Sequence, residues 1–412
     1  MTLTTLTWSL LSTAIHASQL RLKCRVGLQY ADELGNSGPV RHDETNRSFW
    51  QTQYRSLSYL ERRGDNVVPR HTKQGVEVSK QQTVLVAGAG GFIGGHLVAR
   101  LLDQGAAVRG VDIKPLHEWY QLPYGVEAEQ LDLSKIEACH EAVRGVDTVY
   151  MLAADMGGMG FIESHKADCM LSVLTSTHML LAARDANVGR YFYSSSACIY
   201  PLHMQTAADV PALKEADAYP AMSEDGYGWE KLFTERMCRH FLEDFGLVTR
   251  VARYHNVYGP NGTYDGGREK APAALCRKIA EAELSGHHEI EIWGDGEQTR
   301  SFMYIDDCIE GTLRIAASDS SEPVNLGSSE LVSINQMVDI IEEIAGITVK
   351  RTYKLDAPLG VRGRNSDNTM IRDIHGWEPS ISLADGLERT YRWIYDQMAT
   401  ESDSIAMQKV AL

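Results

Sequence analysis

The feature that most restricts the fold is a glycine-rich loop that lies between a short apolar run and an amphipathic segment. The apolar run, Thr-Val-Leu-Val-Ala at 83–87, is typical of a buried parallel strand. The loop after it is Gly-Ala-Gly-Gly-Phe-Ile-Gly at 88–94, and apolar residues then recur at helical spacing. Gly88 permits a tight turn, Gly91 lets the backbone approach a diphosphate, and Gly94 lets the helix pack closely against the strand. We therefore expect the helix N-terminus to bind a diphosphate.

A carboxylate at the end of the second predicted strand extends this prediction to a cofactor. The strand covers 107–111 and stops at Asp112. A carboxylate in this place accepts hydrogen bonds from the ribose hydroxyls of NAD and repels the additional phosphate of NADP. A loop or N-cap role is the alternative for Asp112 taken alone, but the loop and the carboxylate together predict an NAD site. The candidate residues are Gly88, Gly91, Phe92, Ile93, Gly94 and Asp112.

Strand-like and helical patterns alternate along the chain after residue 80. Further strands are predicted at 148–152, 190–194 and 248–253, with helices at 165–187 and 227–244. Alternation of this kind predicts an α/β fold of the Rossmann type, with a doubly wound parallel sheet.

The composition restricts the partners and the compartment. The chain has 40 Lys and Arg against 55 Asp and Glu, a formal net charge of −15. Nucleic acid and anionic membranes would repel such a chain, so we expect neither as a partner. The seven cysteines form no CxxC pair, which argues against a disulfide framework or a metal site and favours a reducing compartment. We therefore expect a cytoplasmic protein.

The first 80 residues differ in composition from the rest of the chain. Residues 1–31 contain no Asp or Glu and several Ser and Thr. We expect 1–80 to be a poorly ordered N-terminal extension, with an organelle transit peptide as the alternative.

A tyrosine and a lysine four residues apart, Tyr227 and Lys231, lie on one face of a predicted helix. A lone tyrosine, with a pKa of about 10, is a poor base at neutral pH. A neighbouring ammonium lowers that pKa, so Tyr227 could take a proton from a hydroxyl while hydride leaves for NAD. Ser196, which follows the strand at 190–194, is the expected hydroxyl donor. The alternative is a surface pair on an amphipathic helix.

Two more residues stand where groups for proton transfer are expected. Cys198 lies in the stretch Ser-Ser-Ala-Cys-Ile-Tyr-Pro at 195–201. A thiol can act as a base when a nearby cation stabilises its thiolate. Lys270, in Gly-Gly-Arg-Glu-Lys-Ala-Pro at 266–272, is the candidate for that cation. The alternatives are an inert buried cysteine and a solvated loop lysine.

These motifs carry a resemblance to a known family. The glycine loop with the Tyr–Lys pair resembles the extended short-chain dehydrogenase/reductase superfamily, in the branch that acts on nucleotide sugars. The two stretches around Cys198 and Lys270, together with Met-Gly-Gly-Met-Gly-Phe at 156–161, resemble the GDP-mannose 3,5-epimerase family. Residues 293–302 and 361–367 extend the match, which covers about 81–398.

The resemblance implies an isomerase with a transient oxidation. NAD would oxidise carbon 4 of GDP-mannose with Tyr227 as the base, and Cys198 and Lys270 would then invert carbons 3 and 5 as an acid–base pair. Re-reduction would give GDP-L-galactose, with the 5-epimer GDP-L-gulose left open as a further product. A plain 4-epimerase or a 4,6-dehydratase is the competing activity, and the Cys198–Lys270 pair argues against it. A non-catalytic NAD-binding regulatory protein is the alternative of another class.

The resemblance also implies individual contacts. Asp132 would lie near the adenine of NAD, and Lys231 would hold the nicotinamide ribose. Arginine binds phosphate through two nitrogens, so Arg300 and Arg364 are candidates for the diphosphate or ribose of the substrate, together with Lys278. The implied substrate contacts are Gly158, Ser196, Ala197, Cys198, Asn256, Glu269, Lys270, Ala271, Lys278, Gln298, Thr299, Arg300 and Arg364. Asp155 receives no role.

The same resemblance implies the organisation of the chain. It predicts an NAD-binding domain at 81–255, a smaller, mainly substrate-binding domain at 256–398, and a tail at 399–412. The chain would return to the first domain near 324–328. A homodimer would form through the predicted helices at 165–187 and 227–244.

Overall fold

The structure is a computed structural model that describes residues 82–410, with side chains described through residue 400. The predicted extension at 1–80, including the alternative of a transit peptide, lies outside the described residues. None of the helices within the described part is both long enough and apolar enough to cross a membrane.

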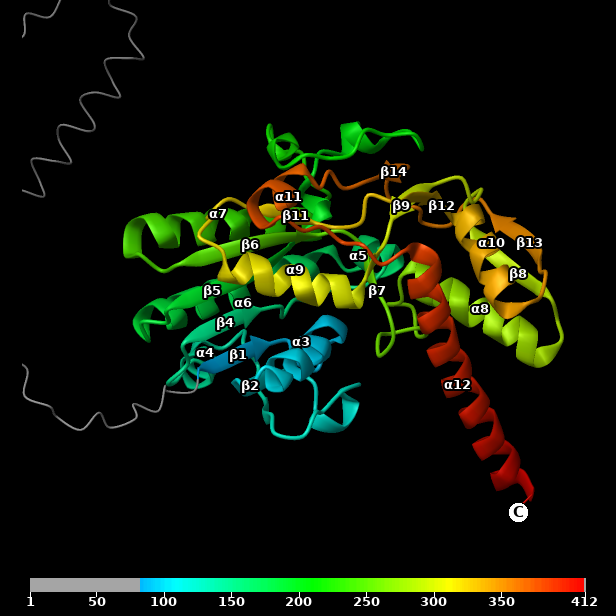
Figure 1. The fold of residues 1–412 in the computed structure, drawn as a ribbon, viewed down its shortest axis with the longest axis horizontal. Helices are drawn as coiled ribbons and strands as arrows, with labels where there is room; N and C mark the ends of the chain where they lie inside the picture. The colour runs from blue at the N-terminus through cyan, green and yellow to red at the C-terminus, as the bar shows by residue number, and fades with distance from the viewer. Residues whose placement is uncertain (1–81, 411–412) are drawn as a thin grey trace, which may run out of the picture. The chain divides into compact units, whose positions relative to one another are not determined.

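A seven-stranded parallel sheet forms the centre of the described residues (Figure 1). Its spatial order is β11-β6-β5-β4-β1-β2-β3, so the chain starts in the interior of the sheet and winds outwards in both directions. This arrangement confirms the predicted Rossmann-type α/β fold. The strands are β1 Thr83–Ala87, β2 Ala107–Asp112, β3 Glu127–Gln130, β4 Thr148–Met151, β5 Arg190–Ser196, β6 Thr249–Tyr254 and β11 Val324–Leu326.

Helices cover both faces of this sheet because alternate strand residues point to opposite sides. Leu85 and Ala87 of β1 pack in a core with α4, α6 and α7, whereas Val84 and Val86 pack in another core with α3 and α9. The helices are α3 Phe92–Asp103, α4 Ile136–Ala142, α6 Lys166–Asp185, α7 Tyr227–Phe245 and α9 Ile305–Ala317.

The C-terminal half contributes smaller sheets and further helices; Figure 1 shows α8, α10, β8 and β13 together at one end of the large sheet and α11 beside β11. The core that contains Val84 and Val86 continues into this half without interruption. The helices of this half are α8 Ala271–Ser285, α10 Ile334–Ala345, α11 Thr369–His375 and α12 Leu383–Val410. The short helix α5 Met159–Ser164 lies earlier in the chain, between β4 and α6. The strands are β7 Val257–Tyr258, β8 Glu289–Trp293, β9 Thr299–Ser301, β10 Met303–Tyr304, β12 Leu331–Ser333, β13 Lys350–Lys354 and β14 Gly363–Arg364.

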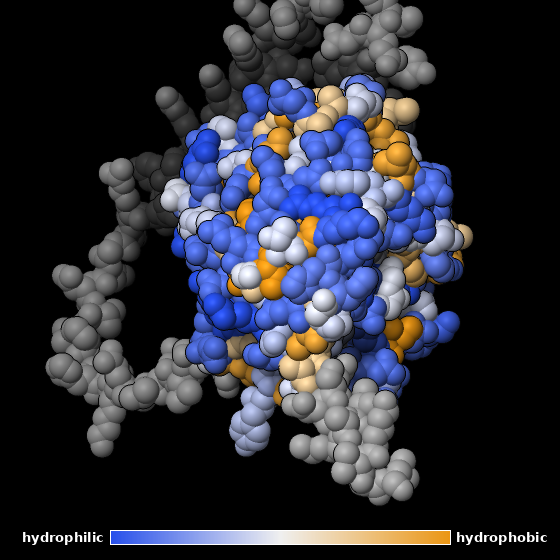
Figure 2. Space-filling view, turned by 90° about the vertical axis from the view of Figure 1, so that its right-hand side faces the viewer, coloured by the Kyte–Doolittle hydropathy of each residue, from blue (hydrophilic) through white to orange (hydrophobic). Residues whose placement is uncertain are grey.

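Two features of the C-terminal half bear on the expected division of the chain. Strand β11 pairs with β6, so the chain does enter the large sheet again at 324–326. Helix α12 continues through Val410, so residues 399–410 of the predicted tail are helical. The surface over the end built by α8, α10, β8 and β13 is mainly hydrophilic, with scattered hydrophobic spots (Figure 2).

The glycine loop joins β1 to α3 through two tight contacts. Gly88 has a φ of +89°, a region that residues with side chains rarely adopt. A Cβ at Gly94 would overlap the carbonyl oxygen of Gly88, so only glycine allows the first turn of α3 to lie on the loop.

Replacement of this glycine should therefore destabilise the fold. We expect Gly94→Ala to lower the free energy of unfolding by about 1–3 kcal/mol, because the added methyl group meets backbone that cannot rotate away. The adjacent Gly95→Ala is the matched control, since its Cβ would lie 3.0 Å from the movable Gln121 side chain. Urea unfolding of both variants measures the difference, and equal stability of the two would contradict the packing argument.

Candidate active site

The N-terminus of α3 is open to a ligand. The helix begins at Phe92, and its N-cap, Gly91, has an extended backbone without any side-chain cap. The Gly91 amide donates to the Gly88 carbonyl at 3.1 Å, which folds the loop back beneath the helix. The first amides of α3, those of Phe92, Ile93 and Gly94, therefore lie at an uncapped helix end that suits a diphosphate. The loop fits the predicted dinucleotide.

Two carboxylates stand at the same edge of the sheet as this loop. Asp112 ends β2 and is buried, and one of its oxygens accepts a hydrogen bond from the Lys114 amide at 3.0 Å. Asp132 follows β3, which pairs with β2 in parallel, so it lies beyond the same ends of the strands. A hydrogen bond from Ser134 lowers the pKa of Asp132 and keeps it ionised. The second oxygen of Asp112 is the group that suits a ribose hydroxyl.

The Tyr–Lys pair lies at the start of α7, next to the end of β5. Tyr227 is the first residue of the helix, and Lys231 is buried one turn later. Lys231 Nζ donates to the Ser194 carbonyl at 3.1 Å and lies 5.5 Å from the centre of the Tyr227 ring. The two residues therefore face the same side of the helix, as their spacing indicates.

The electrostatics of Tyr227 differ from the sequence prediction. Burial raises the pKa of Tyr227 well above 10, and the neighbouring Cys198 and Glu230 raise it further, whereas a hydrogen bond with Ser196 lowers it. Burial also lowers the pKa of Lys231, which the Glu230 carboxylate raises. The pKa of Tyr227 therefore moves upward, opposite to the predicted lowering, because burial is the largest influence on it.

Glu230 is a member of this cluster that sequence reasoning missed. Its side chain is buried, and it accepts hydrogen bonds from Thr234 at 3.1 Å and from the Tyr193 hydroxyl at 3.3 Å. Its other oxygen lies 3.8 Å from Lys231 Nζ. Its position directly before Lys231 is the only signal in the sequence, and helical spacing would place it on a different face.

Cys198 lies one short turn beyond β5, in a 3-10 helix at Ala197–Ile199. Ser196 caps this turn by accepting the Cys198 amide at 3.2 Å. A Cβ at Gly228 would overlap the carbonyl oxygen of Cys198, so glycine lets the first turn of α7 lie directly against the thiol segment. The residues predicted as catalytic on β5 and on α7 are brought together by this contact.

The cation in contact with the thiol is Arg364, and this corrects the prediction for Lys270. Arg364 on β14 donates to Cys198 Sγ at 3.6 Å and to Gln205 at 2.6 Å, and it forms a buried ion pair with Glu224. Gln205 and Glu224 were not singled out in the sequence, where nothing marks them. Because its guanidinium already serves these three groups, Arg364 is less available for the diphosphate than expected.

This arrangement keeps Cys198 protonated. Burial raises the pKa of the thiol to about 11, and the Glu224 carboxylate contributes in the same direction. Arg364 and Ser196 act in the opposite direction. Since Glu224 neutralises Arg364, the thiol lies beside an ion pair with no net charge.

Lys270 lies at the same cluster and comes from the C-terminal half of the chain. It is the half-buried N-cap of α8, at the end of the loop at 266–270. Burial lowers the pKa of its ammonium, the Cys198 thiolate would raise it, and Arg364 lowers it again. Within the described residues Lys270 forms no ion pair. It therefore interacts with Cys198 through the electric field and not through a hydrogen bond.

Arg300 is the cation best placed for an anionic ligand. It lies on β9, donates only to backbone carbonyls, including that of Thr299 at 2.7 Å, and has no ion-pair partner in the described part of the chain. Burial and the nearby Arg364 lower its pKa to about 10. A half-buried guanidinium without a carboxylate partner is suited to phosphate. Lys278, in contrast, is engaged with the Glu291 carbonyl at 2.6 Å.

The remaining predicted contacts fall into two groups. Near Arg300, Asn256 donates to the Ser301 carbonyl at 3.0 Å, and Thr299 donates to the Ala208 carbonyl. Gln298 donates to the Trp293 carbonyl at 2.9 Å, while its own amide oxygen is buried without a partner among the described residues. That oxygen is an acceptor available to a ligand.

The second group surrounds Lys270. Gly158, the N-cap of α5, donates to the Arg268 carbonyl at 3.0 Å. The Glu269 carboxylate accepts the Gly267 amide at 2.6 Å, and Ala271 begins α8. The segment after β4 and the loop before α8 are thus in direct contact.

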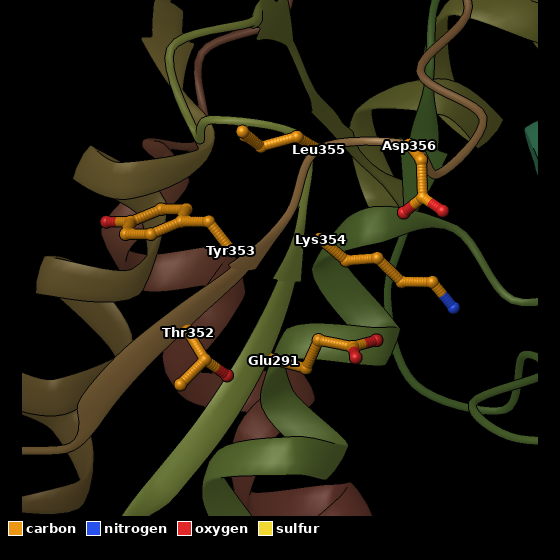
Figure 3. A pocket seen from close by; sticks show the side chains of 6 residues that line it. All are labelled: Glu291, Thr352, Tyr353, Lys354, Leu355 and Asp356. Atoms are coloured by element: carbon orange, nitrogen blue, oxygen red, sulfur yellow. The ribbon is translucent and has the colours of Figure 1, made fainter.

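An open hollow lies elsewhere on the C-terminal half. It has a volume of about 480 Å³ and is lined by Glu291 of β8 and by residues 352–356 at the end of β13 (Figure 3). None of the predicted site residues lines it. The chemistry described above does not extend into this hollow.

Comparisons with known proteins agree with this geometry. The chain is 47% identical over 324 residues to GDP-mannose 3,5-epimerase 1 of Oryza sativa subsp. japonica, a match that covers 78% of this chain and 84% of the relative. It is 45% identical to GDP-mannose 3,5-epimerase of Arabidopsis thaliana, with 78% and 85% covered.

Solved structures and a family match extend the comparison. The UDP-glucose 4-epimerase of Thermotoga maritima, with UDP-glucose, has a TM-score of 0.70 at 25% identity and covers 77% of this chain and 100% of its own. The UDP-glucuronic acid 4-epimerase of Bacillus cereus, in complex with UDP-glucuronic acid and NAD, has a TM-score of 0.66 at 25% identity, with 77% and 100% covered. Residues 84–327 match the NAD dependent epimerase/dehydratase family. The chain belongs to the NAD dependent epimerase/dehydratase family.

Proposed function

We propose that this protein epimerises GDP-mannose at carbons 3 and 5 to give GDP-L-galactose. The observation that carries the proposal is one buried cluster that combines two sets of groups. Ser196, Tyr227 and Lys231 supply the residues for oxidation of a hydroxyl. Cys198 and Lys270 add a second acid–base pair, which a simple oxidation and re-reduction does not need.

The residues that would hold NAD lie at the carboxyl edge of the large sheet. The uncapped amides of α3 suit its diphosphate, Asp112 suits the ribose next to adenine, and Lys231 suits the ribose next to nicotinamide. When bound, NAD supplies the acceptor and later the donor of a hydride.

Oxidation at carbon 4 requires removal of a proton from its hydroxyl. Tyr227 is the base for this step, and Ser196 donates a hydrogen bond to the reacting oxygen. Lys231 Nζ lies 5.5 Å from the centre of the Tyr227 ring, so its charge opposes the burial that favours the phenol.

The ketone at carbon 4 makes the C–H bonds on carbons 3 and 5 acidic. Cys198 and Lys270 then exchange protons with these carbons. Burial raises the pKa of the Cys198 thiol to about 11, so the thiol holds its proton, and burial lowers the pKa of the Lys270 ammonium, which makes its proton easier to release. In the chair form of a mannosyl ring the hydrogens on carbons 3 and 5 lie on the same face. One group must therefore remove both protons, and exchange with water must reset the pair between the two inversions.

The substrate's diphosphate needs a positive group in this acidic chain. Arg300 is half-buried, lies near Arg364 and has no carboxylate partner within the described residues. We assign binding of the diphosphate to Arg300. Arg364, which contacts the Cys198 thiol, influences the pKa of that thiol instead.

A homodimer is part of the proposal. Helices α6 and α7 are neighbours, and both expose large apolar side chains. Met170, Leu171 and Leu174 of α6 and Trp229 and Phe233 of α7 are each at least 40% exposed. Apolar groups that recur along two adjacent helices are typical of an interface, and a second copy of this chain supplies the same apolar face.

A cytoplasmic location also belongs to the proposal. The six cysteines in the described residues are free and buried, which fits a reducing compartment. Microscopy of the full-length chain with a C-terminal tag tests this location, and import into an organelle would contradict it.

The proposed reaction predicts solvent exchange at two carbons. Incubation with GDP-mannose in heavy water should place deuterium at carbons 3 and 5, detected by NMR of the recovered sugar. A 4-epimerase returns only the hydride and would place deuterium at neither carbon. Cys198→Ala should retain NAD binding and lose the exchange. Exchange at neither carbon in the natural protein would exclude the proposed activity.

The control of Cys198 by Glu224 can be measured without substrate. Glu224→Gln keeps a hydrogen-bond acceptor for Arg364 and removes the charge that raises the pKa of the thiol. The thiol pKa should fall from about 11 by roughly one unit, the size expected of a single close charge. The pH dependence of Cys198 alkylation, followed by peptide mass spectrometry, reports this shift.

Asp225→Asn is the matched control for this measurement. The Asp225 side chain is exposed and pairs with Lys166, so its loss should leave the alkylation profile of Cys198 unchanged. An unchanged or higher pKa in Glu224→Gln would contradict the role given to Glu224.

The dimer predicts a sensitive position on α7. Phe233→Glu places a charge in the apolar face and should weaken dimerisation at least tenfold, because the carboxylate loses water on association. Leu122→Glu, at an equally exposed apolar residue outside these helices, is the control. Sedimentation over a concentration series measures both variants, and an unchanged dimer in Phe233→Glu would place the interface elsewhere.

A further inference from the structure

One exposed arginine connects the loop before α8 to the segment after β4. Arg268 Nη1 lies 2.8 Å from an Asp155 carboxylate oxygen and 3.3 Å from the Met156 carbonyl oxygen. The same guanidinium lies over the Phe161 ring, 3.7 Å from its centre. A single side chain therefore contacts a carboxylate, a carbonyl and an aromatic face on one segment.

The backbones of the two segments also fit closely. The Gly158 amide donates to the Arg268 carbonyl at 3.0 Å. A Cβ at Gly158 would overlap the Glu269 carbonyl oxygen, so no other residue would allow this approach. The side chain of Arg268 thus makes its contacts where the backbone of the loop already touches the backbone of the segment after β4.

The two segments differ in how firmly they are held. The Asp155 amide donates to the hydroxyl of Ser172, which is buried on α6. On the other side, Gly266 and Gly267 have φ values of +87° and +88°, and a Cβ at either would meet no atom within 4 Å. Glycines in open space give the loop little resistance to movement. The contacts of Arg268 with Asp155 and Phe161 therefore add side-chain restraint to a loop that is otherwise held by the hydrogen bonds of Gly267 with Glu269 and of Gly158 with Arg268.

Lys270 follows Arg268 by two residues and is the N-cap of α8. Its place near Cys198 depends on where the loop lies against the segment after β4. We propose that Arg268 and Asp155 form a clamp that positions Lys270 for proton transfer with the substrate. Arg268 is a positioning residue in this proposal, which rests on the proposed function.

The clamp gives a role to Asp155 and accounts for the exposure of its ion pair with Arg268. Asp155 has no partner in the chemistry of carbons 3, 4 and 5, yet it holds the loop that delivers Lys270. Both side chains of the pair are about half exposed, at 48% and 43%. An exposed ion pair contributes little to the stability of the fold. We therefore expect the clamp to affect the position of the loop and not the free energy of unfolding.

The test compares Arg268→Ala with the natural protein in the heavy-water assay. We expect kcat for exchange at carbons 3 and 5 to fall at least tenfold and KM for GDP-mannose to change much less than kcat, since Arg300, which we assign to the diphosphate, is untouched. The pH dependence of kcat should also change, because a displaced Lys270 is more exposed to water and regains a higher pKa. A loss of stability alone would lower the amount of active protein, but it would change neither KM nor the pH at which kcat is half-maximal.

Rescue variants make the test specific. Arg268→Lys keeps the ion pair and should recover part of kcat, and the exchange Asp155→Arg with Arg268→Asp should be more active than either single change. The control is Arg372→Ala, on α11, which removes a similarly exposed ion pair with Glu378. This variant should match the natural protein.

The outcomes separate the two proposals. If the natural protein shows no exchange at either carbon, the proposed function fails. If it shows exchange and Arg268→Ala exchanges at the same rate with the same pH profile, the clamp is excluded while the function stands. A loss of activity in Arg268→Ala that neither rescue variant reverses would also overturn the clamp.

Discussion

The close approach of α7 to the backbone of Cys198 is the contact on which the site depends. Gly228 has no side chain, so the first turn of the helix lies against the carbonyl of Cys198. This contact places Tyr227 and Lys231 beside the end of β5, where Ser196 and Cys198 follow one another. A single glycine thus brings the oxidation groups and the thiol into one buried cluster.

Burial then sets the charges of this cluster. Each strongly buried carboxylate has a cation beside it, Glu230 with Lys231 and Glu224 with Arg364. Desolvation is the largest influence on the reactive groups and raises the pKa of both Tyr227 and Cys198, and the carboxylates of Glu230 and Glu224 act in the same direction. Arg300 has no such partner among the described residues, and this leaves its positive charge available to a negatively charged ligand.

The sequence predicts the large sheet better than the smaller ones. Strands β1, β2, β4, β5 and β6 begin and end within two residues of the predicted runs, because each contains a run of apolar or aromatic residues typical of a strand with little exposed surface. The edge strand β3, with the sequence Glu-Ala-Glu-Gln, carries no such run and is a strand because it pairs with β2. The two- and three-residue strands of the C-terminal half have no periodicity that a sequence pattern could reveal.

The sequence by itself determined the glycine loop, the Tyr227–Lys231 spacing and the thiol after Ser196. Each of these depends on residues a few positions apart, so local geometry is enough to relate them. Only the tertiary structure decided that Arg364 contacts a thiol 166 residues away and that Arg268 pairs with Asp155 across 113 residues. The strength of these interactions depends on the distance between the groups and on their burial. Neither quantity can be read from residue types or from spacing along the chain.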